Sequence, residues 1–434
     1  MLKKLFGYNL VLFVLIILEN LFFFVFYKDG YLDNATNAIG YSIISLLIAI
    51  VLLLKYYNKH IEIIQPSTST SKNNLLILLL LIAAIVWLSI KSYPIFIFLP
   101  VDFRTSDIIP TIEILVKRFL AEGQNPYDRK ALVDLGYNIP STYLPMHWLP
   151  YSIAEIFKFD YRWITFSIWA IGFSFVAFST AKQKNYLNST LVILLLSCTY
   201  FLITDKYPDI LGYTVETMVA GYYMILITSM NQKNGYLLGL AIGVCLLSRY
   251  SLALWLPLMA FVLFVSGGKN RQLLLKAIIA ASVFVAVVYI IPFLSHDWTA
   301  FYDSHMAYEN NAIGEWHHNN DQNLPCHLYK GVGFAQFYYE AYLKTDLHIG
   351  YALLRSTMFI SILISSAILG IWYWFKKTKI DYRIFLMASF KIYITIFSAL
   401  IMVPYLYLIV IGNFISIAIF SQQLKYAPVK LNGE

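Results

Sequence analysis

Charged residues are scarce in this sequence. Only 13% of its 434 residues are Asp, Glu, Lys or Arg, whereas soluble domains carry about 25%. At the same time 59% of the residues are hydrophobic, and a soluble fold could not bury so much apolar surface without large exposed patches. The shortage of charge therefore excludes a soluble globular protein.

Cysteine is also scarce, with three residues in the whole chain. Cys198 and Cys245 lie inside apolar runs and Cys326 stands alone in a polar stretch, which excludes a disulfide framework and a compact metal motif. The net charge of +8 is spread in twos and threes between apolar runs and forms no basic stripe, so nucleic-acid binding is excluded too. We expect neither a metal nor another cofactor.

Long apolar runs are abundant. A transmembrane helix needs about 20 mostly apolar residues, and the first run is too long for a signal peptide and has no cleavage site after it. The predicted spans are 5–27, 38–55, 75–98, 163–181, 186–203, 210–230, 235–249, 252–266, 273–294, 349–375, 384–403 and 404–422. The sequence thus predicts an all-α polytopic membrane protein of about 12 transmembrane helices.

Lysine and arginine in the connections predict the orientation of these spans. One alternate set of connections is rich in both, whereas the short connections of the other set contain only Lys28, Lys206 and Arg249. The positive-inside rule then places both termini in the cytoplasm. This parity requires that 143–158, which contains two prolines, a histidine and a glutamate, is an interfacial or re-entrant segment.

The topology divides the chain into regions. We expect an N-terminal transmembrane pair, a polar cytoplasmic linker, a transmembrane core with a first outer loop at 99–162, a second outer loop and C-terminal transmembrane helices. Their bounds are 1–64, 65–74, 75–294, 295–348 and 349–434. The two outer loops contain most of the acidic residues and all but one of the histidines, so polar chemistry is concentrated on one face.

Asp102 follows the third span directly, in the sequence FLPVDFRTSD, with Arg104 and Asp107 close behind. A carboxylate at the edge of the membrane is partly desolvated, which raises its proton affinity, while a nearby arginine lowers it. Such a group can act as a general base. The alternative is a charged residue that only marks the end of the span.

The first loop continues with an amphipathic helix at about 107–121. This helix is expected either to lie on the membrane surface or to pack on the core of the loop. Gly123 and the pair Asn125-Pro126 then break the helix before Tyr127.

The order of these features resembles the first outer loop of GT-C glycosyltransferases. The resemblance lies in the membrane-exit Asp-Phe, the surface helix, the Gly-x-Asn-Pro-Tyr stretch and a later Tyr143-Leu144-Pro145 that opens an apolar helix. It is strongest to the polyprenyl-phosphate-mannose-dependent alpha-mannosyltransferases of phosphatidylinositol mannoside synthesis. The resemblance implies that Asp102 is the catalytic base. It also implies that Arg104, Asp107 and Tyr127 bind substrate.

A second segment, GLAIGVCLLSRYSLALWLPL, resembles a stretch of the same family in which a basic residue follows a small-residue helix, and Arg249 occupies that place. A guanidinium binds phosphate through paired hydrogen bonds, so Arg249, with Lys206 as a further candidate, is expected to hold the donor phosphate. The alternative for Arg249 is a helix-end arginine that reaches to the interface. The sequence departs from the family at Glu216, where an amide is usual, and in its two N-terminal spans.

The second loop contains Trp316, His317 and His318. An indole can stack on a sugar ring and imidazoles can bond hydroxyls, so these residues and Glu216 are expected to bind substrate. The alternative is a solvated cap over the first loop. Glu19, Asn20 and Lys391 lie within spans, where polar residues usually pair with each other.

Together these features predict an inverting glycosyltransferase at the outer face of a bacterial inner membrane. It would transfer a hexose, mannose by resemblance, from a polyprenyl-phosphate sugar to a glycolipid or glycan acceptor. Alternatives are a polymerase or ligase of lipid-linked polysaccharide and a lipid or sugar transporter. A transporter should show ionisable groups paired near the bilayer midplane, and the spans are expected to lack them.

Overall fold

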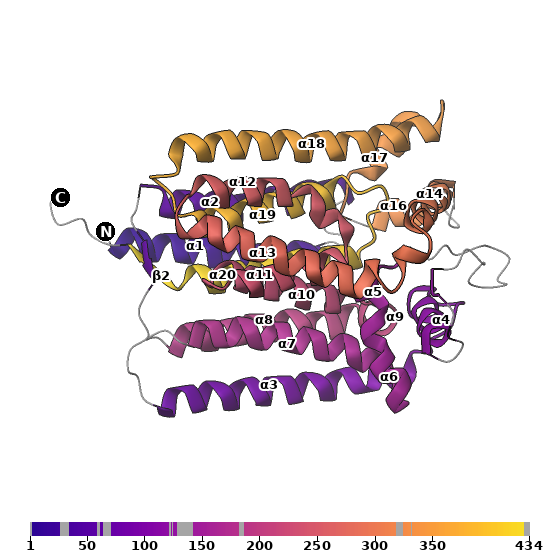
Figure 1. Ribbon diagram of the computed structural model, residues 1–434, viewed down its shortest axis with the longest axis horizontal. Helices are drawn as coiled ribbons and strands as arrows, with labels where there is room; N and C mark the ends of the chain where they lie inside the picture. Colours follow the sequence, from indigo (N-terminus) through magenta and orange to yellow (C-terminus); the bar gives the residue numbers. More distant parts are fainter. Residues whose placement is uncertain are drawn as a thin grey trace.

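The computed structural model confirms a helical architecture of the membrane type (Figure 1). It describes residues 2–26, 34–58, 61–63, 71–120, 123, 125–127, 142–181, 186–317, 324–330 and 332–428. Within these residues the β structure consists of one short antiparallel ribbon, in which β1 (Ile61–Ile63) pairs with β2 (Tyr426–Pro428).

Eight helices of the described residues are long and apolar enough to cross a membrane. They are α1 (Leu2–Leu21) with the π-turn η1 (Phe22–Phe26), α2 (Asn34–Tyr56), α3 (Ser71–Phe98), α7 (Arg162–Ala181), α8 (Tyr186–Lys206), α13 (Lys269–Val285) with η4 (Ala286–Ile290), α18 (Leu347–Lys376) and α19 (Tyr382–Ala399). The prediction of a polytopic helical membrane protein is therefore confirmed.

The other four predicted spans fall on shorter helices. These helices are α9 (Pro208–Tyr213) with α10 (Glu216–Met230), α11 (Gly235–Leu246), η3 (Tyr250–Leu254) with α12 (Leu256–Val265), and α20 (Tyr407–Gln423). Each main helix has fewer residues than the roughly 20 that cross a bilayer unaided. A total of about 12 crossings stays a prediction.

The helices of the two long loops gather at one end of the bundle (Figure 1). The first loop forms α4 (Ile108–Leu120), α5 (Pro145–Trp148), η2 (Leu149–Tyr151) and α6 (Ser152–Phe157), and the second forms η5 (Leu294–His296), α14 (Ala300–Ala312), α15 (Gly314–His317), α16 (Cys326–Lys330) and α17 (Ala335–Tyr342). The start of α1 and strand β2 lie at the opposite end. We call the end that holds the loop helices the loop end.

The helices of the first loop pack on the protein. The apolar side of α4, including Ile109, Ile112 and Leu115, is buried, and α4 contacts α5, η2 and α6. Of the two expectations for this amphipathic helix, packing on the loop core is therefore the one that the structure shows. The segment 143–158 is broken into three short helices, which fits the expectation that it does not cross the membrane.

Helices α10 and α20 occupy the centre of the bundle and are buried on nearly all sides. Close approach of α10 to α7 depends on Gly172 and Gly221, because a Cβ atom added at Gly221 would lie 2.6 Å from the carbonyl oxygen of Ile168. Small residues at such crossings let membrane helices approach closely enough for dispersion contacts to hold them. This packing fixes the start of α10, where Glu216 lies.

One expectation about the spans is wrong. Glu19 of α1 and Lys391 of α19 are both fully buried, and their side chains form an ion pair of 2.6 Å. The expected internal pairing of these residues is thus confirmed, but the spans do contain paired ionisable groups. The mean hydropathy of a span is little affected by a single charged residue, and it cannot show that this residue pairs with an opposite charge on another helix.

Candidate functional site

The turn between α11 and η3 lies at the centre of the candidate site. Helix α11 ends at Leu246, and the backbone becomes extended at Arg249 (φ −139°, ψ 98°) before η3 begins. The amide of Arg249 donates to the carbonyl of Cys245 at 2.7 Å, and the amide of Met146 donates to the carbonyl of Leu247 at 3.0 Å. The first loop is therefore attached directly to the turn that presents Arg249.

Arg249 forms an ion pair with Glu216, the first residue of α10. Its Nη2 donates to Oε1 of Glu216, whose side chain is almost completely buried, whereas the arginine side chain is 32% exposed. Glu216 Oε2 and Arg249 Nε have no hydrogen-bond partner among the described residues. The guanidinium is thus held by one carboxylate and keeps donor capacity for a ligand.

A tyrosine and a histidine from the first loop border this pair. The ring of Tyr143 stacks on the ring of His147, with centroids 4.5 Å apart. Burial, then the positive charge of Arg249, lowers the pKa of His147, whose ring also hydrogen-bonds to the backbone of Ser248. His147 is therefore neutral at physiological pH, and its Nδ1 has no partner among the described residues.

Asp107 contributes a carboxyl group to the same cluster. Burial raises the pKa of Asp107, and the negative charge of Glu315 in the second loop raises it further. Asp107 and Arg249 both act electrostatically on Tyr143 and Tyr308. Carboxyl groups of both long loops thus lie close enough to interact electrostatically with each other and with Tyr308.

Tyrosines of the second loop and of α20 complete the cluster. Tyr405 hydrogen-bonds to Glu315, and the rings of Tyr405 and Tyr407 stack with centroids 5.1 Å apart. Tyr407 is the first residue of α20 and interacts electrostatically with Arg249 and Glu216. We define the site cluster as Asp107, Tyr143, His147, Glu216, Arg249, Tyr308, Glu315, Tyr405 and Tyr407.

Asp102, the predicted base, lies in a turn of its own. Its Oδ1 accepts the backbone amide of Arg104 at 2.6 Å, and its carbonyl accepts the amides of Thr105 and Ser106. The carboxylate is half-exposed and the side chain of Arg104 is exposed. A catalytic role of Asp102 stays a prediction, and the described contacts of its carboxylate are those of a residue that caps a turn.

Tyr127 and Lys206 lie near the cluster in supporting positions. The hydroxyl of Tyr127 accepts from Trp148 Nε1 and donates to the carbonyl of Tyr143, both at 2.8 Å, so Tyr127 holds the first loop in shape. Lys206 ends α8, next to the short helix α9 that packs on Leu99 at the exit of α3. It is half-buried at the loop end of the bundle.

The second loop places its predicted sugar-binding residues away from the cluster. Trp316 is fully buried, donates its Nε1 hydrogen to the carbonyl of Met402 at 3.0 Å, and packs against Tyr339 and Tyr351. It therefore offers no ring face to a sugar, which corrects the expected stacking role. His317 is exposed with its ring 6.1 Å from that of His348, and His318 lies outside the described residues.

Side-chain contacts hold helix α14 of the second loop beside the turn that contains Arg249. His305 Nδ1 lies 3.2 Å from the hydroxyl of Tyr250, the residue after Arg249, and His305 Nε2 lies 3.1 Å from Glu309. Glu309 in turn forms an ion pair of 2.5 Å with Arg355 of α18. These contacts hold α14 where Tyr308 interacts electrostatically with Arg249.

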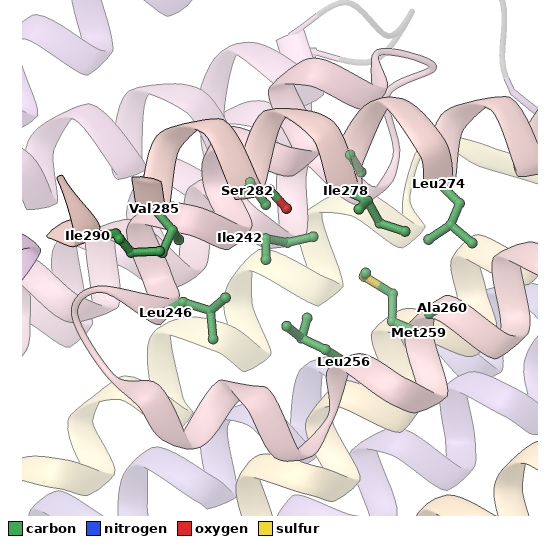
Figure 2. A pocket seen from close by; sticks show the side chains of 12 residues that line it. Ile242, Leu246, Leu256, Met259, Ala260, Leu274, Ile278, Ser282, Val285 and Ile290 are labelled. Atoms are coloured by element: carbon green, nitrogen blue, oxygen red, sulfur yellow. The ribbon is translucent and has the colours of Figure 1, made fainter. Parts of the chain in front are cut away.

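An apolar pocket of about 360 Å³ adjoins the same turn (Figure 2). Leu246 and Leu256, which flank the turn, line the pocket together with residues of α12 and α13. The labelled side chains are aliphatic apart from Met259 and the hydroxyl of Ser282. The remaining lining residues are Ile242, Ala260, Leu274, Ala277, Ile278, Ala281, Val285 and Ile290.

Comparisons with known proteins add no identification, since no family model, curated protein or solved structure matches this chain. The assignment of the site therefore depends on its geometry. Sequence reasoning singled out Asp107, Glu216 and Arg249, and it missed Tyr308, Tyr405 and Tyr407. No local pattern marks these tyrosines, because they become neighbours of Arg249 only when the second loop and α20 fold against it.

Proposed function

We propose that this protein is an inverting glycosyltransferase that uses a polyprenyl-phosphate sugar. The observation that supports this function is that Arg249 belongs to a polar cluster of carboxyl and hydroxyl groups and follows, by three residues, Leu246 in the wall of an apolar pocket. A donor with a phosphate between a sugar and an isoprenoid chain offers one part to each of these three features. The sugar is a hexose, with mannose as the first candidate from the resemblance.

The donor would bind with its chain in the apolar pocket and its phosphate on Arg249. An isoprenoid chain that enters from the bilayer exchanges contacts with lipid tails for contacts with aliphatic side chains, so the pocket holds it by packing rather than by the hydrophobic effect. The exposed part of the Arg249 guanidinium can then donate to a phosphate oxygen. Glu216 neutralises part of the arginine charge, which matches the site to a singly charged phosphodiester rather than to a more highly charged diphosphate.

We take Asp107 rather than Asp102 as the general base. Its pKa is raised by burial and by Glu315, so it holds a proton more tightly than an ordinary carboxyl, as a base acting on a hydroxyl requires. The carboxylates of both residues accept a backbone hydrogen bond. Asp107 acts electrostatically on Tyr143 and Tyr308, as Arg249 does.

The transfer step follows from these roles. Asp107 removes the proton of an acceptor hydroxyl as the oxygen attacks the anomeric carbon, and the bond from that carbon to the phosphate oxygen breaks on the opposite face. The departing polyprenyl phosphate gains a negative charge, which Arg249 stabilises more strongly than it stabilised the diester. Tyrosine hydroxyls of the cluster can hydrogen-bond to the sugar.

We place the loop end on the outer face of a bacterial inner membrane and both termini in the cytoplasm. This orientation is supported by the basic residues of the connections at the other end of the bundle. Lipid-linked sugars presented at the outer leaflet would reach the apolar pocket from within the bilayer.

The proposal is tested by a transfer assay with purified protein in lipid nanodiscs. A panel of labelled polyprenyl-phosphate hexoses is offered with membrane glycolipid extract as acceptor, and product is measured for the wild type, Asp107→Asn and Asp102→Asn. We expect wild-type transfer, loss of at least about a hundredfold in Asp107→Asn, and retained transfer in Asp102→Asn. Absence of wild-type transfer from every donor would remove the proposal, and activity only with lipid-linked oligosaccharide would favour a polymerase or ligase.

A further inference from the structure

The ion pair between Glu19 and Lys391 is a feature of the membrane interior that the proposed chemistry does not use. Both side chains are fully buried, and Lys391 Nζ lies 2.6 Å from Glu19 Oε1. Ser45 Oγ of α2 donates to the same carboxylate oxygen at 2.8 Å, and Thr395 Oγ1 of α19 lies 2.9 Å from Ser45 Oγ. The pair thus joins the N-terminal helices α1 and α2 to α19.

The same network reaches the first half of α20. Lys391 Nζ donates to the carbonyl of Gly412 at 3.2 Å. The hydroxyl of Tyr41 donates to Asn413 Oδ1 at 2.9 Å and lies 3.4 Å from the carbonyl of Ile409. Polar groups of α2 and α19 therefore contact two consecutive residues of α20, Gly412 and Asn413, and Ile409 in the preceding turn.

Gly412 allows the backbone of α20 to lie close to the hydroxyl of Tyr41. A Cβ atom added there would lie 2.7 Å from the hydroxyl oxygen of Tyr41, so the backbone of α20 approaches Tyr41 as closely as it can. Breaking a buried pair by removing one partner is strongly unfavourable, and polar groups inside a bilayer have few alternative partners. The network therefore fixes the rotation of α20 about its own axis, and its position along that axis, relative to α2 and α19.

Tyr407 begins α20 less than two turns before Gly412 and belongs to the site cluster. We propose that Glu19, Lys391 and Tyr41 are positioning residues, which hold the start of α20 so that Tyr407 faces the Glu216–Arg249 pair. This inference rests on the proposed function, which assigns the site cluster to donor binding. It gives the two N-terminal helices, which are additional to the family that the sequence resembles, a role in shaping substrate binding.

A matched control lies at the other end of α20. Lys55 of α2 is also buried in the bundle and donates to Asn9 Oδ1 at 2.6 Å and to Gln423, the last residue of α20. Lys55→Met therefore removes a buried lysine between the same helices but far along α20 from Tyr407. It should lower overall stability without loosening the start of α20.

The first test needs no enzymatic activity. Amide hydrogen exchange of the full chain in detergent is measured by mass spectrometry for the wild type, Lys391→Met, Tyr41→Phe and Lys55→Met. We expect exchange of the peptide covering 405–413 to rise by about tenfold in Lys391→Met and Tyr41→Phe, and to remain at the wild-type rate in Lys55→Met. An unchanged peptide in the first two variants, or the same increase in all three, overturns the proposal.

The second test uses the transfer assay. Tyr41→Phe, which removes one hydroxyl and keeps the ring, should raise the KM for the donor by about fivefold at nearly unchanged kcat, because binding geometry is altered and the base is intact. Lys55→Met should leave KM unchanged, and an equal change in both variants overturns the proposal. If the wild type transfers no sugar, the proposed function fails, whereas the exchange result still decides whether the network positions α20.

Discussion

Arg249 and Glu216 are joined by a hydrogen-bonded ion pair, although 33 residues separate them in the chain. The pair connects the start of α10 to the end of α11, and the glutamate lies at a helix N-terminus, where its negative charge is favourable. A buried carboxylate with a half-exposed arginine leaves the arginine as the group that a ligand can reach. Glu216 therefore acts as the anion that holds Arg249 when no phosphate is bound.

Arg249→Gln should abolish transfer and also destabilise the protein. Removing the guanidinium leaves Glu216 buried without its partner, at a cost of about 1 to 3 kcal/mol because the arginine is partly exposed. Glu216→Gln should instead raise the affinity for the donor by about fivefold, or about 1 kcal/mol, since the competing carboxylate charge is gone. Donor titrations and thermal unfolding in nanodiscs measure both effects.

Arg271→Gln is the matched control for these variants. Arg271 donates to the carbonyl of Phe264 near the start of α13, away from the loop end. Its replacement should leave transfer at the wild-type rate. Weaker donor binding in Glu216→Gln would contradict the competition between carboxylate and phosphate.

The rate of transfer should fall at low pH through the raised pKa of Asp107. The base must be ionised, so the acid limb of the pH profile lies above the ordinary aspartate value of about 3.9. Glu315→Gln removes the negative charge that raises this pKa, and the limb should move to lower pH. Glu340→Gln, which affects a carboxylate bound to Tyr329, should leave the limb in place.

The raised pKa of Asp107 also predicts how the stability of the folded protein changes with pH. A carboxyl whose pKa is higher in the folded than in the unfolded protein favours folding below its unfolded pKa, and this contribution is lost as the pH rises through the folded pKa. Asp107→Asn should therefore increase stability near neutral pH. Loss of transfer in Asp102→Asn, together with an unmoved limb in Glu315→Gln, would reassign the base to Asp102.

The helical architecture could be predicted because hydropathy acts locally. Each apolar run must satisfy its backbone hydrogen bonds within itself in a membrane, so runs and helices coincide. The breaks within runs depend on tertiary packing. Helix α10, for example, begins only at Glu216, six residues into the predicted span 210–230.

The site could be predicted only in part, because its contacts join distant segments. Charge and position singled out Arg249 and Glu216 separately, but neither residue type reveals its partner. Asp102 and Asp107 are five residues apart, and only the fold of the loop shows that Asp107 interacts with Glu315 while the carboxylate of Asp102 accepts the amide of Arg104. The burial of Trp316 likewise depends on how Tyr339 and Tyr351 fold over it.

Tyr127→Phe should destabilise the first loop. The substitution removes the acceptor of Trp148 Nε1 and the donor to the Tyr143 carbonyl, and Trp148 is fully buried. Leaving such a donor unpaired costs about 1 to 3 kcal/mol. Thermal unfolding in detergent measures the loss of stability. Tyr302→Phe, at an exposed tyrosine of α14, is the control. Equal stability of the two variants would contradict a stabilising role of the Tyr127 hydroxyl.

Cysteine labelling should place the loop end outside the cell. In a chain whose native cysteines are replaced, Ala307→Cys in α14 is compared with Lys233→Cys, between α10 and α11, at exposed positions. A maleimide that cannot cross membranes should label position 307 in intact cells and position 233 only after permeabilisation. The reverse pattern would put the site cluster in the cytoplasm and exclude donors presented at the outer leaflet.

Filling the apolar pocket should weaken binding of long-chain donors selectively. Ala281 of α13 lines the pocket, and a phenylalanine there takes the space of an isoprenoid segment. Forcing an added side chain and the donor chain into the same space costs about 1 to 3 kcal/mol, so KM for a long polyprenyl-phosphate donor should rise by about tenfold.

A donor with a short isoprenyl chain separates this effect from damage to the chemistry. Because such a chain need not enter the pocket, its KM in Ala281→Phe should equal that of the wild type. Ile279→Phe adds the same ring on an exposed side of α13, outside the pocket lining, and should affect neither donor. An equal loss with both donors in Ala281→Phe would mean that the pocket does not hold the donor chain, and Arg249 would then have to receive its phosphate from another direction.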